Sequence, residues 1–325
     1  MALSPIVLFV YNRPWHTQQT LEALAKNNLA DQSDLIVYAD GPKPNASDDD
    51  LMKIQEVRSI VTERKWCKTV TIIESKTNKG LADSIIEGVT SVVNSCGKVI
   101  VLEDDIVTSP GFLTYMNEAL TVYEKDEKVM HISGYMFPVK AKLPSTFYYN
   151  TASCWGWATW KRAWKCFNPN AYDLLQQIYG KNKIYTFTLG FSSPFLMHLE
   201  QNITGEIHTW AIKWYASFIL SNGYALHPYP SLTNNIGFDA SGQHSNASKK
   251  YYWNKLADSI PIETIKKKES RQARKAMASF YGTPFTRISI IKHMLKIYCY
   301  NLGVLKFISS HKVQSFERTV LKRQI

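Results

Sequence analysis

The 325-residue chain has few of the features that mark secreted, zinc-binding or membrane-spanning proteins. Its five cysteines are scattered and form no Cys-x-x-Cys pair, which argues against a disulfide framework and a zinc site. No apolar run approaches the roughly 18 residues that a membrane-spanning helix needs. The first residues carry no basic stretch ahead of an apolar one, so we expect neither a signal peptide nor an anchor, and a cytoplasmic setting.

Two phosphate-binding motifs are also missing. No Gly-x-Gly-x-x-Gly follows the first apolar run, and no Gly-x-x-x-x-Gly-Lys-Ser/Thr occurs anywhere in the chain. These motifs supply the glycine-rich turns that hold a dinucleotide or a nucleoside triphosphate. Their absence removes the main support for a dinucleotide-dependent dehydrogenase and for a P-loop enzyme.

Charge of both signs is present, but it is unevenly spread. Residues 1–260 hold 24 basic and 24 acidic residues, whereas residues 261–325 hold 14 basic and three acidic ones. The net charge of +11 therefore lies in the last fifth of the chain, which we expect to be a basic helical extension. Such a region suits an anionic membrane surface, and the alternative is a solvated helical face that only aids solubility. Because it lacks interleaved aromatic residues and a recognisable reader motif, we expect no nucleic acid partner.

Apolar runs alternate with amphipathic stretches over the first 135 residues. This alternation predicts an α/β fold with a doubly wound sheet that is flanked by helices. The predicted strands are 5–11, 34–42, 69–73, 98–102 and 129–135, and the predicted helices are 15–25, 51–64, 81–93 and 112–120.

The second half of the chain is richer in tryptophan and less regular. Residues 157–164 have tryptophans at helical spacing, residues 205–220 read as a helix, and residues 224–227 as a strand. Trp155, which precedes a glycine, and Trp157 are candidate platforms for stacking on a sugar ring. Core packing is the alternative explanation, above all for Trp157 and the tryptophans that follow it.

Three adjacent carboxylates, those of Glu103, Asp104 and Asp105, follow the predicted strand 98–102. Ser109 and Pro110 then predict the N-cap and first turn of a helix. Three such charges repel one another unless a cation or hydrogen-bond donors neutralise them. In open α/β sheets, ligands bind outside the carboxyl ends of the strands. A divalent metal that bridges these acids to a phosphate would satisfy both conditions, and a solvated acidic turn is the alternative.

Other polar residues follow the neighbouring predicted strands. Arg13 comes after the first strand and Asp40 after the second, where they could meet a diphosphate and a nucleoside. Lys79 and Gly80 open a predicted helix whose free N–H groups could assist a diphosphate. An ordinary turn or loop is the alternative for Asp40 and Lys79.

With these motifs in view, the sequence resembles nucleotide-sugar glycosyltransferases of the GT-A fold. It is similar to bacterial family-2-like sugar transferases and, more distantly, to N-acetylglucosaminyltransferase I. The resemblance covers roughly residues 5–250 and implies a mixed sheet. It is carried by Val7–Pro14, Tyr38–Pro42, Leu102–Asp105 with Ser109–Phe112, Gly156-Trp157, Trp210–Trp214, and Asn235–Phe238 with His244.

The resemblance implies a role for each acid. Asp105 would hold Mn²⁺ or Mg²⁺ on the donor diphosphate, and Asp104 would face the ribose or the donor sugar. Glu103 would face the sugar or the acceptor. Arg13 and Asp40 would lie against the nucleoside, and His244 near the metal or the diphosphate.

The chain departs from the family at the expected catalytic base. Relatives tend to carry an aspartate beside the first tryptophan of the Trp-x-x-x-Trp helix, whereas Ala211 follows Trp210 here. Glu206 and His208 are the candidates for the base, with Glu103 and Asp239 as further alternatives.

Together these features predict a metal-dependent, inverting glycosyltransferase that uses a UDP-sugar or related donor. The expected acceptor is a glycan or a lipid-linked sugar in bacterial surface polysaccharide synthesis, with the chain peripheral on the inner membrane face. The alternatives are an inactive nucleotide-sugar or glycan-binding relative and a nucleotidyltransferase. We expect a catalytic domain over 1–260, with a nucleotide-sugar half (1–135) and an acceptor half (136–260), followed by the basic region 261–325.

Overall fold

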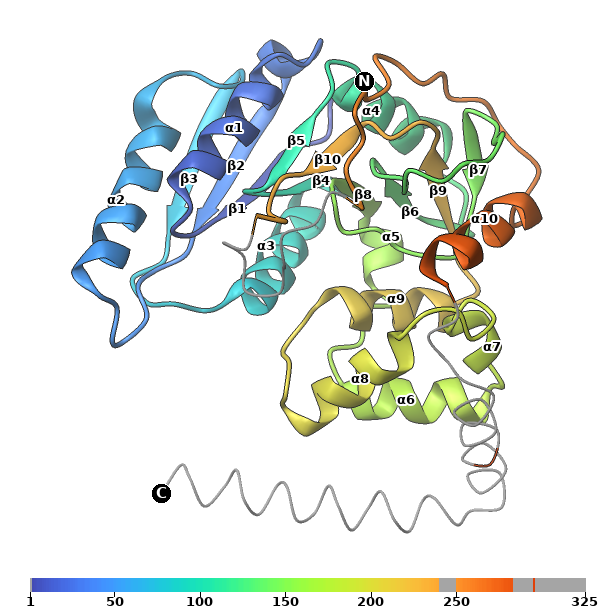
Figure 1. Ribbon diagram of the computed structural model, residues 1–325. Helices are drawn as coiled ribbons and strands as arrows, with labels where there is room; N and C mark the ends of the chain where they lie inside the picture. The colour runs from blue at the N-terminus through green and yellow to red at the C-terminus, as the bar shows by residue number, and fades with distance from the viewer. Residues whose placement is uncertain (1, 240–249, 283–294, 296–325) are drawn as a thin grey trace.

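The central element of the computed structural model is an eight-stranded sheet (Figure 1). The structure describes residues 2–239, 250–282 and 295. The strand order of the sheet is β3-β2-β1-β4-β8-β6-β9-β7. The first four of these strands are parallel, and β8 and β7 run antiparallel to their neighbours, so the sheet is mixed as the resemblance implies. The strands are β1 Ile6–Val10, β2 Asp34–Ala39, β3 Thr69–Glu74, β4 Lys98–Glu103, β6 Val129–Ser133, β7 Thr146–Tyr148, β8 Trp157–Trp160 and β9 Tyr224–Pro228.

Helices cover both faces of this sheet. Alternate residues of β1 point to opposite faces, so Leu8 packs with α1, α2 and α4 while Val7 packs with α3 and the helices of the second half. The layer formed by α6 to α9 lies below the sheet in Figure 1. The helices are α1 Pro14–Ala25, α2 Asp48–Glu63, α3 Leu81–Cys96, α4 Phe112–Val122, α5 Lys161–Trp164, α6 Ala171–Gly180, α7 Ile184–Phe187, α8 Phe195–Thr204, α9 Ala211–Leu220 and α10 Arg271–Tyr281.

A two-stranded ribbon stands beside the main sheet. It pairs β5 (Ile106–Thr108) antiparallel with β10 (Thr233–Asn235), although more than 120 residues separate them in the sequence. Because β5 starts directly after the acids, the chain makes a turn and a short strand there. The helix α4 begins only at Phe112, so the predicted N-cap at Ser109 is wrong and Gly111 takes that position.

The tryptophan-rich segment is a strand where the sequence predicts a helix. Residues 157–160 form β8, buried between β4 and β6, and only the short α5 follows. The residues of a strand alternate between faces, so Trp157 joins the core on the α3 side and Trp160 the core on the α1 side. Their separation of three residues fits a helix equally well, which explains the wrong prediction.

The predicted helix over 205–220 is also wrong at its start. Gly205 ends α8 in the left-handed conformation, with φ at 76°, and α9 begins at Ala211. Glu206 and His208 therefore lie in the connecting loop and not in the first turn of a helix.

Helix α10 comes from the basic C-terminal region but packs on the body of the protein. Its Ala273 and Met277 are fully buried in a cluster with Met136, Phe147 and Tyr149. Residues 283–294 and 296–325, which carry much of the predicted basic extension, lie outside the described residues. Among the residues that the structure describes, no helix is both long and apolar enough to cross a membrane.

Candidate functional site

The site lies where β1 and β4 end side by side. These strands are parallel neighbours, with Phe9 opposite Glu103, so the residues that follow them meet at one edge of the sheet. Arg13 leaves β1 as the N-cap residue of α1, and Asp104 and Asp105 form the turn between β4 and β5. The structure thus brings together three residues that the sequence assigned to one crevice.

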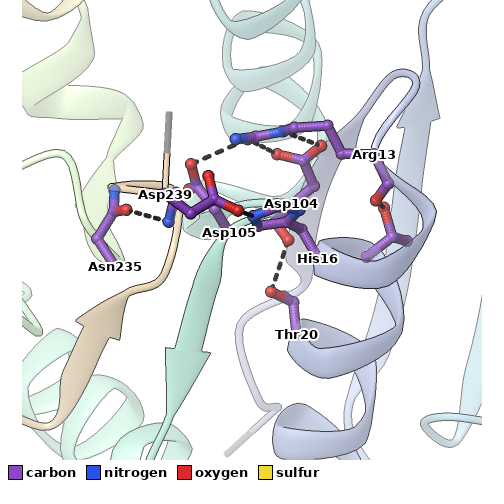
Figure 2. Close-up of polar contacts among 9 residues, drawn as sticks. Arg13, His16, Thr20, Asp104, Asp105, Asn235 and Asp239 are labelled. Atoms are coloured by element: carbon purple, nitrogen blue, oxygen red, sulfur yellow. Dashed lines mark hydrogen bonds and ion pairs between the residues drawn. The ribbon is translucent and has the colours of Figure 1, made fainter. Parts of the chain in front are cut away.

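The Arg13 guanidinium joins the two aspartates (Figure 2). Its Nε donates to Asp104 Oδ2 at 3.1 Å, and its Nη2 donates both to Asp104 Oδ1 and, at 2.9 Å, to Asp105 Oδ2. The main-chain oxygen of Asp104 accepts a hydrogen bond from Thr20 Oγ1 at 2.8 Å. Both aspartates are buried, with 5% and 9% exposure. A guanidinium that spans two buried carboxylates neutralises part of their repulsion.

The β5–β10 ribbon fixes the position of Asp105 from the other side. Ile236 N donates to the main-chain oxygen of Asp105 at 2.9 Å. The next residue is Gly237, where a Cβ atom would lie 2.2 Å from Asp105 Oδ2. Real side chains do not approach an oxygen this closely, so the site requires glycine at this position.

Burial and charge shift the pKa values of this cluster. Burial, together with the nearby charges of Asp105 and Asp104, raises the pKa of Glu103 well above its usual range. Burial also raises the pKa of Asp104, to about 6, although Arg13 opposes the shift. Burial alone would lower the pKa of Arg13, but the two aspartates outweigh it and raise that pKa, so Arg13 stays charged.

The chemistry of Asp105 fits a divalent cation that is shared with a substrate. Its Oδ1 atom is buried and has no hydrogen-bond partner among the described residues, whereas its Oδ2 atom is held by Arg13. Over the described part of the chain, no group of three or more His, Cys, Asp or Glu side chains could form a complete metal cage. Mg²⁺ usually binds through one or two carboxylates plus substrate phosphates, which such a site allows. The other predicted ligand, His244, lies outside the described residues.

His16 is a member of this site that the sequence analysis missed. It lies one turn along α1 from Arg13, and its Nε2 atom is 3.1 Å from Asp239 Oδ2 (Figure 2). Burial and the Arg13 charge lower the pKa of His16. The only available signal was its place in the first turn of a helix that begins at the crevice.

Asp40 lies at the end of β2, but its carboxylate is fully engaged by the loop that precedes α3. Oδ1 accepts from the main-chain N–H groups of Gly41 and Lys79, and Oδ2 accepts from Asn78 Nδ2 and the Gly80 N–H, all within 3.0 Å. A carboxylate has about four acceptor sites. A hydrogen bond to a nucleoside would require one of these four to open. The ammonium of Lys79 pairs with Glu87 at 2.6 Å.

The two candidate stacking tryptophans have different environments. Trp157 has no exposed surface and stacks on Trp210 and His131, so it belongs to the core and cannot receive a sugar ring in this structure. Trp155 is half-buried, and its ring meets that of Phe238 edge-on at 5.3 Å. Phe238 follows Gly237, so Trp155 remains the candidate on the acceptor side.

The candidate bases Glu206 and His208 lie in an exposed loop between α8 and α9. Glu206 accepts hydrogen bonds from Thr204 and Gln201. His208 Nε2 lies 2.9 Å from Asp83 Oδ1, in the first turn of α3, and both side chains are more than half exposed. The structure gives neither residue a contact with the acids that follow β4, so the base remains a prediction.

Comparison with known proteins adds little to this geometry. No family model matches the sequence, and no curated protein matches it significantly. Among solved structures, the mannosyltransferase PcManGT from Pyrobaculum calidifontis, in complex with GDP-Man and Mn²⁺, is 14% identical, with 50% of this chain and 45% of that one covered and a TM-score of 0.35. S. aureus TarS is 12% identical, with 51% and 30% covered and a TM-score of 0.33.

A third similar structure, a UDP-glucose pyrophosphorylase complexed with UDP-glucose, is 10% identical, with 70% and 90% covered and a TM-score of 0.33. The chain spans less than half the length of the first two structures. Likeness at this level supports no argument about activity. The assignment to the mixed α/β class rests on the sheet and helices of the chain itself.

Proposed function

We propose that this chain transfers a sugar from a nucleoside diphosphate sugar to an acceptor hydroxyl, with Mn²⁺ or Mg²⁺ as cofactor. One observation carries the proposal. Within the part of the chain that the structure describes, the buried Oδ1 atom of Asp105 has no hydrogen-bond partner, and Arg13 already holds the other oxygen of that carboxylate. A divalent cation bound there would neutralise charge on the departing nucleoside diphosphate.

The donor diphosphate would lie between Arg13 and the start of α1. This helix has no side-chain cap and no acidic residue in its first turn. Its first residue, Pro14, has no N–H group, so an anion here would meet only the N–H groups that follow it. Arg13 supports a diphosphate through paired N–H donors. In the structure, Asp104 pairs with Arg13 at the start of this helix.

The acceptor side would be lined by Trp155 and Phe238. Their half-buried rings offer a surface on which a sugar ring can stack, beside Gly237 and the acids. A base must take the proton of the acceptor hydroxyl as its oxygen attacks the anomeric carbon from the face opposite the leaving group, which inverts that centre. His208 and Glu206 are the proposed bases, with Glu103 and Asp239 as alternatives.

The test is a thermal-shift panel of UDP-, GDP-, CDP- and dTDP-sugars, each with and without Mn²⁺, on the wild type and on Asp105→Ala. We expect one nucleotide to stabilise the wild type in a metal-dependent way and to lose this effect in the variant. The absence of a shift with every nucleotide would contradict the proposal.

An inactive relative that only binds the nucleotide sugar is a second candidate. It is favoured by Ala211 beside Trp210 and by the exposed loop that holds His208 and Glu206. Release of the nucleoside diphosphate separates the two candidates, because only a transferase or a donor hydrolase releases it. His208→Gln and Glu206→Gln would identify the base through a rate loss of about 10²- to 10⁴-fold.

The basic C-terminal region bears on where the chain would act. We propose that residues 261–325 lie near anionic lipid at the inner membrane face, where a lipid-linked glycan acceptor would be found. The charge imbalance of this region supports the idea. Equal binding of anionic vesicles by the full chain and by a variant that ends at Gly282 would contradict it.

A further inference from the structure

We propose that Arg13 is an internal counter-ion of the two aspartates, which a divalent cation and a nucleoside diphosphate replace together. Arg13 would leave the carboxylates for the diphosphate as the cation arrives at Asp105. The inference rests on the proposed function and names how its donor site is regulated. It makes metal binding and nucleotide binding mutually dependent.

The resting arrangement carries the first step. Arg13 holds three of the four side-chain oxygens of Asp104 and Asp105, and the described residues give the fourth, Asp105 Oδ1, no partner. A cation on Oδ1 would share one carboxylate with a guanidinium whose Nη2 atom is 2.9 Å from Oδ2. Two cations that share one carboxylate in a buried setting repel each other strongly. We therefore expect the site to bind a metal ion weakly when no nucleotide is present and Arg13 stays in place.

The surroundings of Asp105 leave little room for another arrangement. Gly237 is so close that even a Cβ atom there would lie 2.2 Å from Asp105 Oδ2 and 3.1 Å from Arg13 Nη1. The main-chain oxygen of Asp105 is fixed by Ile236 N. Arg13 has 20% side-chain exposure against 12% for Asp105, and its side chain is longer, so the arginine is the partner that moves.

Arg13 can pair with a diphosphate once it leaves the aspartates. Its side chain keeps 20% exposure, and it belongs to the uncapped start of α1. A diphosphate at the first turn of α1 would bring oxygens to the guanidinium. These oxygens would replace the hydrogen bonds that the guanidinium gives up when it leaves the aspartates. The phosphates would also supply the remaining oxygen ligands of the cation. Each ligand thereby removes the obstacle to the other, which is a positive coupling.

The experiment measures Mn²⁺ binding by the full chain through the electron paramagnetic resonance signal of free Mn²⁺. Wild type, Arg13→Gln and Arg58→Gln are titrated without nucleotide and with UDP, GDP, CDP or dTDP, after subtraction of the Mn²⁺ that each nucleotide binds in solution. Arg58 is the matched control, because it is a partly buried arginine that pairs with Glu74 and Ser75, away from the acids.

We expect Arg13→Gln to bind Mn²⁺ alone about tenfold more tightly than the wild type, and Arg58→Gln to match the wild type. One nucleotide should tighten Mn²⁺ binding by the wild type about tenfold, and this effect should nearly vanish in Arg13→Gln. Asp105→Asn should remove the binding in every case. If Arg13→Gln is too unstable, Arg13→Lys keeps the positive charge but loses the paired N–H donors of the guanidinium. It should show a smaller increase in Mn²⁺ affinity.

Equal Mn²⁺ affinity of the wild type and both Arg13 variants, with no nucleotide present, would overturn the counter-ion role. This arm contains no nucleotide, so its outcome does not depend on the proposed donor. Failure of every nucleotide to bind the wild type would instead overturn the proposed function, and with it the coupling.

Discussion

Two buried polar clusters of this protein handle charge in opposite ways. At the ends of β1 and β4, Arg13, Asp104 and Asp105 form a charged cluster. In the second half of the sheet, His131 of β6 and His227 of β9 lie with their rings fully buried. Each histidine has its Nε2 atom about 3 Å from a main-chain oxygen, that of Ser153 for His131 and that of Thr151 for His227.

The histidines are kept neutral. Burial lowers the pKa of His131 to about 3 and that of His227 to about 4. The neighbouring His227 lowers the pKa of His131 further, and main-chain hydrogen bonds offset the effect of burial only in part for both rings. The Nδ1 atom of His131 accepts from Trp214 Nε1 at 3.2 Å, so both ring nitrogens are used. The acid cluster keeps its charges. Among the described residues, His227 Nδ1 lacks a hydrogen-bond partner as Asp105 Oδ1 does, so the two clusters differ in charge and in place and not in the number of hydrogen bonds. The neutral pair belongs to the core, whereas the charged cluster, at the ends of two strands, can bind a charged ligand.

The strongest test of this contrast compares Asp105→Asn with His131→Gln. Asp105→Asn keeps the shape but removes the charge, so we expect donor turnover to fall about 10²- to 10³-fold, as when one electrostatic group of an active site is lost. His131→Gln should lower the melting temperature and leave turnover per folded molecule within about threefold of the wild type. Release of nucleoside diphosphate, normalised to folded protein, measures both. Equal losses in the two variants would remove the distinction between the clusters.

Acid should act on the histidine pair. An unfolded histidine has a pKa near 6.5, above the folded values of about 3 and 4, so the unfolded state binds more protons between these limits. The free energy of unfolding therefore falls as the pH falls below 6.5, by up to about 1.4 kcal/mol per pH unit for each histidine and about 2.8 kcal/mol per pH unit for the pair. Above pH 6.5 this contribution is complete.

The buried carboxyl of Asp104 opposes this trend, because its pKa of about 6 lies above the unfolded value. The quantity to compare is therefore the slope of the free energy of unfolding against pH in the wild type and in His131→Gln. Denaturant unfolding at pH 5.0 to 7.0 measures it. The variant should have the shallower slope. Parallel slopes would show that His131 is not held neutral.

Gly237→Ala should damage the charged cluster by steric means. The new Cβ atom must displace Asp105 or Arg13, and crowding of this kind costs about 2 kcal/mol. We expect weaker metal-dependent nucleotide binding, seen as a smaller thermal shift. Gly97→Ala is the control, because its Cβ meets nothing within 4 Å and only the left-handed backbone at the end of α3 is strained. A full thermal shift in Gly237→Ala would contradict the close approach.

The smallest effect is expected at Asp40. Asp40→Asn replaces one acceptor oxygen by a donor and should lower the free energy of unfolding by about 1 to 2 kcal/mol through the loop that precedes α3. Metal binding at Asp105 should stay unchanged. Loss of nucleotide affinity without loss of stability would instead assign Asp40 to the nucleoside, as the resemblance implies.

The first half of the sheet could be predicted because its signals are local. Each strand is a short apolar run, and the carboxyl ends of parallel strands share an edge, so Arg13 and the two aspartates were assigned to one crevice. The full hydrogen bonding of Asp40 was not predictable, because three of its four donors come from residues 78–80, beyond another strand and helix.

The second half gave weaker signals for physical reasons. β8 is buried on both faces and shows no alternation, and its tryptophans have a spacing that a helix also allows. The ribbon of β5 and β10 has three residues in each strand, too few for a periodic pattern. Contacts of His16 with Asp239 and of Gly237 with Asp105 arise only when distant segments meet.

The β5–β10 ribbon also bears on protein engineering. A chimera that joins residues 1–135 of this chain to the second half of a homologue would separate Asp105 from the strand that positions it. Ile236 and Gly237 would then come from a different parent than Asp105, whose main-chain oxygen and carboxylate they adjoin. Segments 104–108 and 233–237 should therefore be inherited as a unit, together with Arg13, which pairs with both aspartates.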